Sequence, residues 1–424
     1  MKATRFEFLR AAGAAASLPA LAPRLRAQTP GNQPVPAAPA PVRPADLGTR
    51  FADVVALASE NSYRLSFLGP RFASHAAFEA EARKSVFDAL LYRPEPVAPE
   101  PEVLETVDCG SYIRKRITFR TTPHFRVPAY LLVPRNLNGP APGIVDLHSH
   151  GGMFLFGKEK VVDLNAGGTR NPWRGDGSSS DHLADLRTPP TATELVKRGY
   201  VVISIDAFGF GERRIVLDND LPAALDRDSL SVEEVRRLSR VCAGKESTLV
   251  KSLTLAGLTW PGIVFWDDIR TVDYLSSLPE VDAKRIGCLG VSMGGYRSLY
   301  LAALDTRIQA GCIAGFMSTA KPMLRAHVDT HSFIHFLPAL HRDLDFPDVA
   351  SLTAPRALMV LQCSRDGLFP LNGMQDSLRL IGSAYRKAGV EEQFFGKFYD
   401  HPHIFSVNMQ QEAFAWLDKH LKRN

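Results

Sequence analysis

Residues 285–296 restrict the possible folds of this chain more than any other segment. A short apolar run leads into Gly-Val-Ser-Met-Gly at 290–294, and residues that favour a helix follow. A strand that turns this sharply into a helix holds the central Ser292 in a strained conformation and lifts its hydroxyl above the sheet. Glycine is needed on both sides because a Cβ there would collide with the neighbouring backbone. The segment predicts a nucleophilic serine, with the Met293 amide at a helix N-terminus where it can stabilise an oxyanion.

The same pentapeptide also occurs by chance in ordinary turns, so the prediction depends on partners elsewhere in the chain. Asp366 follows the apolar run 357–363, and His403 follows the predicted last strand, 393–399. An aspartate in this place can orient a histidine, and that histidine can act as the general base for the serine. His401 is the alternative base. Asp366 could instead be a turn former, because Asp-Gly pairs are common in turns.

A second oxyanion donor is expected after the short apolar strand 143–148. The chain continues there as Ser-His-Gly-Gly-Met, and glycine allows a backbone amide to approach a substrate oxygen closely. We expect the Gly152 amide to be this donor, with Gly151 and Met153 as alternatives. A metal site built on the two nearby histidines is disfavoured because no further ligand cluster follows them.

Several other polar residues are compatible with more than one role. Asp206 follows the buried strand 200–205, and bonding of loop amides is a better explanation for it than catalysis. His327, His331 and His335 recur every four residues, so on a helix they would line one face. That face could contact substrate or be a partly buried polar face, and metal binding is disfavoured because no acidic ligands lie between the histidines. The polar, glycine-rich segment 157–188 predicts a long surface insertion near the site.

Composition excludes several functional classes. The chain has 424 residues and a formal net charge of +5, with charges interspersed and no basic block, so we expect no nucleic-acid partner. The five cysteines have no zinc-ligand spacing, and three of them lie in apolar runs, so they are expected to be buried hydrophobic residues without disulfides. We expect no metal and no cofactor.

The first 27 residues predict an export signal. A positively charged start is followed by an apolar run at 11–22 that is too short to span a bilayer, and cleavage after Ala27 is plausible. The start resembles a twin-arginine signal with Phe6 in place of the second arginine, so the export route stays open. An uncleaved amphipathic tail is the alternative. We expect a periplasmic or secreted protein with no stable membrane insertion after cleavage.

The rest of the chain divides into three predicted parts. Residues 28–46 form a linker rich in proline and alanine, and residues 47–105 form a helical extension too small to fold alone. Residues 106–424 form the main domain, which opens with a hairpin at 112–121 and 125–133. The order Ser292, Asp366, His403, each after a strand, is typical of the α/β-hydrolase architecture.

These motifs together resemble the dienelactone-hydrolase-like branch of the α/β-hydrolases. The resemblance rests on Gly-Val-Ser-Met-Gly-Gly at 290–295, Asp-Gly-Leu-Phe at 366–369 and Pro-His-Ile-Phe at 402–405. Within that branch the chain is similar to proteins labelled acetyl xylan esterase or family-seven α/β-hydrolases. The resemblance implies a mostly parallel sheet of about eight strands with helices on both faces. Dienelactone hydrolases use a cysteine nucleophile, whereas Ser292 stands here, which implies ordinary ester hydrolysis.

The sequence therefore predicts an exported serine esterase that acts through an acyl-enzyme on small acyl groups, such as acetyl, carried by carbohydrate-like alcohols. Two alternatives remain. A peptidase of the prolyl-oligopeptidase type is disfavoured because too few residues precede the main domain for a propeller. A binding protein that kept the fold without catalysis is the other alternative.

Overall fold

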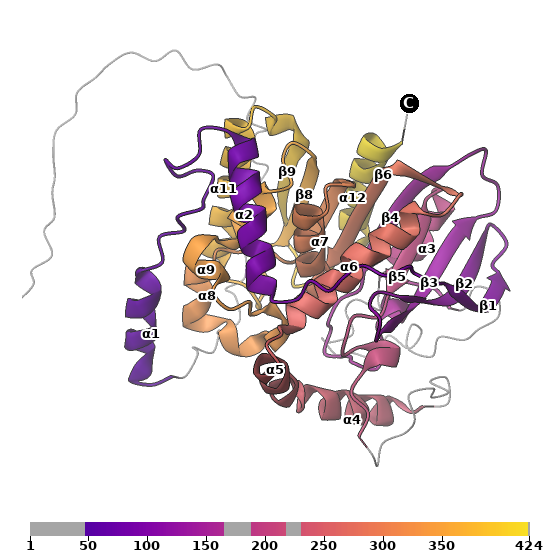
Figure 1. Ribbon diagram of the computed structural model, residues 1–424, viewed down its shortest axis with the longest axis horizontal. Helices are drawn as coiled ribbons and strands as arrows, with labels where there is room; N and C mark the ends of the chain where they lie inside the picture. The colour runs from indigo at the N-terminus through magenta and orange to yellow at the C-terminus, as the bar shows by residue number, and fades with distance from the viewer. Residues whose placement is uncertain (1–46, 165–187, 218–229, 423–424) are drawn as a thin grey trace, which may run out of the picture. The chain divides into compact units, whose positions relative to one another are not determined.

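One sheet organises the computed structural model, which describes residues 47–164, 188–217 and 230–422. The strands of the described residues are β1 (Glu102–Asp108), β2 (Tyr112–Arg120), β3 (Arg126–Pro134), β4 (Ala141–Leu147), β5 (Val201–Ile205), β6 (Val281–Val291), β7 (Ile308–Ala314), β8 (Ala357–Cys363) and β9 (Phe394–Tyr399). Their order across the sheet is β1-β2-β3-β5-β4-β6-β7-β8-β9 (Figure 1).

The sheet is antiparallel at one edge and parallel elsewhere. β1, β2, β3 and β5 pair antiparallel in turn, whereas the pairs from β5 through β4, β6, β7 and β8 to β9 are all parallel. This confirms the predicted hairpin and the mostly parallel sheet. About eight strands were expected, and the additional strand is β1. It is exposed on both faces, so it has no alternating apolar pattern from which to predict it.

The helices connect and cover these strands. The α-helices are α1 (Arg50–Ser59), α2 (His75–Leu90), α3 (Thr191–Lys197), α4 (Val232–Ala243), α5 (Glu246–Leu255), α6 (Trp260–Ser276), α7 (Met293–Leu304), α8 (Ala320–Ala326), α9 (Leu340–Asp343), α10 (Phe346–Ser351), α11 (Leu371–Lys387) and α12 (Val407–Leu421). Short 3₁₀ turns are η1 (Lys158–Lys160), η3 (Gly211–Arg213), η5 (Val328–Thr330), η6 (Phe333–His335) and η7 (Glu391–Gln393).

Both faces of the sheet are covered, as the sequence predicts. Figure 1 shows α6 and α7 lying over the strands, and they contact β4 and β6. The core on the other face includes apolar residues of α3 and α12. Side chains alternate accordingly along β4: Ile144 packs in the α12 core, and its neighbour Val145 packs in the core with α6. Strands buried on both faces carry continuous apolar runs, which is why the sequence revealed them clearly.

Two helices precede the sheet in the predicted extension. α2 buries Phe78, Ala82, Val86 and Leu90, which share one face of the helix, and it contacts α9 and α10. α1 has no buried residue. The predicted signal and linker, residues 1–46, lie outside the described residues, and the domain boundaries remain predictions.

All five cysteines are thiols, not halves of disulfides, and four of them are buried, as expected of small hydrophobic residues.

Among the described residues no single helix is both long and apolar enough to cross a bilayer. Only residues 233–255 taken together with 260–276 meet those criteria, across a bend of 84°.

Candidate active site

The predicted elbow forms between β6 and α7. Ser292 has φ 58° and ψ −121°, a strained conformation for a residue with a side chain. Its amide donates to Ala314 O at 2.9 Å, which ties the turn to the end of β7. A Cβ on Gly290 would lie 2.5 Å from the backbone of Gly294, and one on Gly294 would lie 1.9 Å from Leu147 O. The steric reason for both glycines is therefore present in the structure.

His403 and Asp366 meet at the same edge of the sheet. His403 Nδ1 lies 2.7 Å from Asp366 Oδ2, and Asp366 Oδ1 accepts from the Leu368 amide at 2.9 Å. The Asp366 side chain is fully buried. Since a carboxylate only accepts, the proton of this bond is on Nδ1, and a neutral His403 then has its lone pair on Nε2.

His403 lies beside the strand end that anchors the elbow. A Cβ on Gly315 would lie 3.3 Å from His403 Cε1, and Gly315 directly follows Ala314, the residue that accepts from the Ser292 amide. The alternative base, His401, instead stacks on Tyr399 with ring centroids 6.3 Å apart. The structure thus brings His403 to Asp366, beside the strand end that holds Ser292.

The loop after β4, in which the second oxyanion donor is expected, is anchored by a buried histidine. His148 is fully buried: its Nδ1 donates to Ser149 O at 2.9 Å and its Nε2 accepts from the Ala207 amide at 3.1 Å. Burial holds the pKa of His148 well below its usual value, so the ring is neutral. Both ring nitrogens are occupied by these bonds, which join the end of β4 to the end of β5.

Three amides of this loop were candidates for the second oxyanion donor. The Gly152 amide, the one we expected, donates to His150 Nδ1 at 3.0 Å, and the Met153 amide donates to His150 O at 3.1 Å. Among the described residues, the Gly151 amide has no hydrogen-bond partner. Gly151 and Gly152 have φ values of 56° and 66°, so both need the freedom of glycine.

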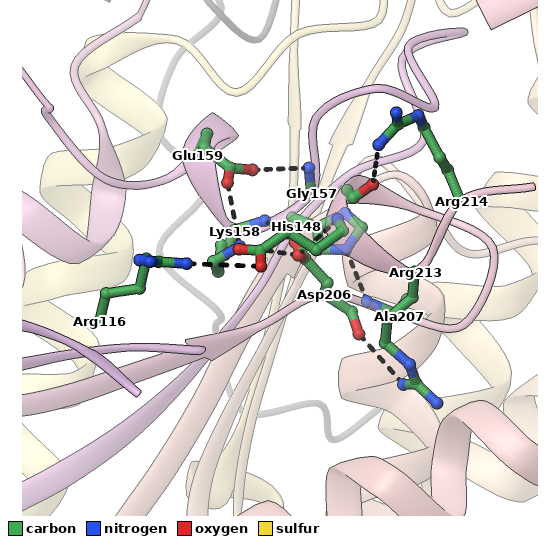
Figure 2. A network of polar contacts seen from close by, with 11 residues as sticks. Arg116, His148, Gly157, Lys158, Glu159, Asp206, Ala207, Arg213 and Arg214 are labelled. Atoms are coloured by element: carbon green, nitrogen blue, oxygen red, sulfur yellow. Dashed lines mark hydrogen bonds and ion pairs between the residues drawn. The ribbon is translucent and has the colours of Figure 1, made fainter. Parts of the chain in front are cut away.

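A buried charge cluster lies next to this loop (Figure 2). Lys158 Nζ donates to Glu159 at 3.0 Å, to Asp206 at 2.7 Å and to Glu212 at 2.7 Å. The carboxylate oxygens of these three residues lie within 4.8 Å of one another, a spacing that could hold a metal ion. The Lys158 ammonium supplies the positive charge that this arrangement requires. Asp206 also accepts from the amides of Lys158 and Glu212, which confirms its predicted role in bonding loop amides.

This cluster corrects the predicted surface insertion. Lys158, Glu159 and Lys160 are at most 5% exposed, although they stand at the start of segment 157–188. Residues 165–187 of that segment lie outside the described residues. A Lys-Glu-Lys run gives no sequence signal for burial, because charged residues are buried only when they are paired in three dimensions.

The histidine series after β7 does not lie on one continuous helix. His331 has an extended backbone, with ψ 141°, between the short turns η5 and η6. The three side chains are nonetheless near the site. His331 contacts the Phe369 ring, with centroids 4.9 Å apart, and Phe369 contacts His403 at 6.5 Å. Burial lowers the pKa of His331 to about 4 and that of His335 well below its usual value, so both are neutral near pH 7.

Sequence reasoning missed one more acidic residue, Glu246 at the start of α5. It accepts from Ser332 Oγ at 2.8 Å and from the Phe333 amide at 3.2 Å, and it lies 3.2 Å from His150 Nε2. No motif surrounds Glu246 in a polar helical segment, so only the three-dimensional contacts identify it.

Comparisons with known proteins agree with this architecture. The model of the Abhydrolase family matches residues 63–424. The Bacillus subtilis protein named "Putative hydrolase YtaP" is 27% identical over 345 residues, which cover 81% of this chain and 99% of that protein.

Solved structures share the fold. A "putative acetyl xylan esterase" from Bacteroides fragilis has a TM-score of 0.62 and 19% identity, over 84% of this chain and 83% of that one. A glucuronoyl esterase from Solibacter usitatus has a TM-score of 0.52 and 15% identity, over 81% of this chain and 91% of that one. The α/β-hydrolase fold expected from the sequence is confirmed, and since the family match spans most of the chain, this protein belongs to the Abhydrolase family.

Proposed function

We propose that this protein is a serine hydrolase of carboxylic esters. The observation that carries the proposal is the 2.7 Å contact between His403 Nδ1 and buried Asp366, at the sheet edge where Ser292 occupies its strained turn. An acid, a base and a strained serine in this relation are the parts that nucleophilic acyl transfer needs. The names of the relatives, a hydrolase and two carbohydrate esterases, support the same reaction class.

In the proposed mechanism, Ser292 Oγ forms a bond to the ester carbonyl carbon while His403 Nε2 takes the hydroxyl proton. Asp366 holds the ring and stabilises the imidazolium that forms. When the tetrahedral intermediate collapses, the bond to the alcohol oxygen breaks and His403 returns the proton to the leaving alcohol. Water then repeats these steps on the acyl-enzyme and releases the acid. The oxyanion is bound by the Met293 amide and by an amide of the loop after β4.

The substrate class follows from the relatives by analogy. We propose small acyl groups, such as acetyl, on carbohydrate alcohols, because the structural neighbours carry the names acetyl xylan esterase and glucuronoyl esterase. We further propose a chain exported to the periplasm or beyond, with residues 1–27 as signal, 28–46 as linker, 47–105 as helical extension and 106–424 as catalytic domain. N-terminal sequencing of the mature protein tests the signal.

A fluorophosphonate probe tests the reaction class directly. We expect labelling of the wild-type protein at Ser292 and none of S292A, with both proteins folded. Ester preference is then measured on p-nitrophenyl acetate, acetylated sugars and xylan, with aminoacyl anilides in parallel. A preference for anilides would refute the esterase proposal, and no labelling of folded wild-type protein would favour a binding protein.

A further inference from the structure

Glu246 connects three parts of the molecule that surround the site. It lies on α5 and is only 8% exposed. Its Oε2 accepts from the Phe333 amide, and its Oε1 accepts from Ser332 Oγ and contacts His150 Nε2. A carboxylate this buried is stable only when donors surround it, and here two loops supply them. The position of α5 is thereby coupled to the loop after β4.

The contact with Glu246 fixes the tautomer of His150. Because a carboxylate only accepts, the hydrogen of neutral His150 lies on Nε2, which leaves Nδ1 as an acceptor. Nδ1 accepts from the Gly152 amide at 3.0 Å. The ring is further held edge-on by Phe154 and Phe210, with centroids 4.8 Å and 5.1 Å away. The hydrogen bond from the Gly152 amide to the His150 side chain therefore holds the backbone between these two residues in a tight turn.

Two carbonyls and one further amide of this loop are also bonded. Lys160 Nζ donates to Ser149 O at 2.8 Å and to His150 O at 2.7 Å, and the Met153 amide donates to His150 O. Within the described part of the chain, the amides of Ser149, His150 and Gly151 have no hydrogen-bond partner. An oxyanion donor must be preorganised and available. Of these three, His150 and Gly151 are the residues whose backbone is held by the bond from the Gly152 amide to His150 Nδ1.

We propose that Glu246 and the His150 side chain are positioning residues for the oxyanion hole, and that the second donor is the free amide of His150 or Gly151 instead of Gly152. Glu246 sets the His150 tautomer, His150 Nδ1 engages Gly152, and this bond holds the two free amides toward the reacting carbonyl. The inference rests on the proposed serine-hydrolase function and deepens it.

Two substitutions at one position separate acceptor from packing. In H150N, the amide oxygen of the new side chain can still accept from the backbone two residues on, as in an Asx turn. In H150F, a ring of similar size keeps the contacts with Phe154 and Phe210 but has no acceptor. We expect kcat on p-nitrophenyl acetate to fall about 100-fold in H150F, with KM nearly unchanged, because a misplaced oxyanion donor weakens only transition-state binding.

H150N should recover at least about tenfold of that loss. The exposed His124 gives the matched control, since H124F should leave both constants unchanged. Midpoints of thermal unfolding, measured for every variant, distinguish misplaced donors from unfolding. The opposite order, with H150F active and H150N impaired, would mean that His150 serves packing and would overturn the proposal, as would equal activity of the two.

A double-mutant cycle tests the link to Glu246 independently. E246Q should lower kcat in the wild-type background, because Gln can present its amide hydrogens to His150 Nε2 and favour the tautomer with hydrogen on Nδ1, which cannot accept from Gly152. In the H150N background the same change should have much less effect, because the asparagine side chain has no tautomer to set. Equal effects in both backgrounds would overturn the role of Glu246. If folded wild-type protein neither hydrolyses esters nor reacts with a fluorophosphonate, the proposed function itself fails.

Discussion

Replacing Lys158 by methionine should destabilise the fold strongly. The Lys158 side chain is fully buried, and its ammonium is the donor shared by Glu159, Asp206 and Glu212. Methionine fills a similar volume and removes only the charge and its donors. The three carboxylates, whose oxygens lie within 4.8 Å of one another, would then repel each other in a site with little water.

The magnitude can be worked out from these contacts. Removing one partner of a buried ion pair costs about 3–5 kcal/mol, because the remaining charge stays buried without compensation. For 424 residues, an unfolding entropy of about 2.1 cal/mol/K per residue gives roughly 0.9 kcal/mol/K. The unfolding midpoint of K158M should therefore fall by about 3–6 °C. Glu212 is 24% exposed, so its share of the loss is smaller than that of Asp206.

Thermal unfolding of K158M, D206N and the double variant K158M/D206N measures this. D206N removes the most deeply buried negative charge while Asn can still accept from a loop amide. The double variant should be more stable than K158M alone, because the two changes are coupled through one cluster. An unchanged midpoint for K158M would show that the cluster contributes little. Simple additivity of the two single changes would show that the charges do not interact.

Three further changes have defined outcomes. Under the proposed mechanism, D366N should lower kcat about 10⁴-fold on p-nitrophenyl acetate with little change in melting temperature, since His403 loses its correct tautomer. Burial raises the pKa of Asp345 to about 7, because the charged form is disfavoured in the folded protein. Protonation of Asp345 therefore favours the folded state; this stabilisation is fully present below pH 4 and is lost as the pH rises through 7. The free energy of unfolding of D345N relative to that of the wild type should accordingly increase by up to about 4 kcal/mol between pH 4 and pH 8, as measured by urea unfolding. R297M should cost about 3–5 kcal/mol in the same assay, because fully buried Asp268 loses its bidentate partner.

The sequence predicted the parts of the fold that depend on local pattern. Parallel strands buried on both faces give apolar runs, and the elbow gives a glycine pattern, so Ser292 and its two neighbouring strands were placed correctly. The exposed β1 has no such pattern and was not predicted. Residues 327–335 form two short turns and not one helix, and a repeat of one residue type every four positions does not show whether the backbone between them is helical.

Candidate site residues could be predicted only where they directly follow a predicted strand. Asp366 and His403 could be selected because each follows a strand, and parallel strands end at one edge of the sheet. Lys158 and Glu246 could not be selected. Their roles come from contacts with residues 48 and 86 positions away along the chain, and neither residue lies in a pattern that distinguishes it from surface charge.

The two sides of this site are held by different kinds of hydrogen bond. The elbow and the end of β7 are tied by backbone bonds, from the Ser292 amide to Ala314 and from the Gly315 amide to Leu361. The loop after β4 is held by side-chain bonds, among them those of Lys160 and Glu246. A substitution removes a side-chain bond but leaves most backbone bonds intact. A single substitution of one of these side chains should therefore displace the loop after β4 without disturbing the elbow, so that the proposed esterase activity is lost while the sheet is still folded.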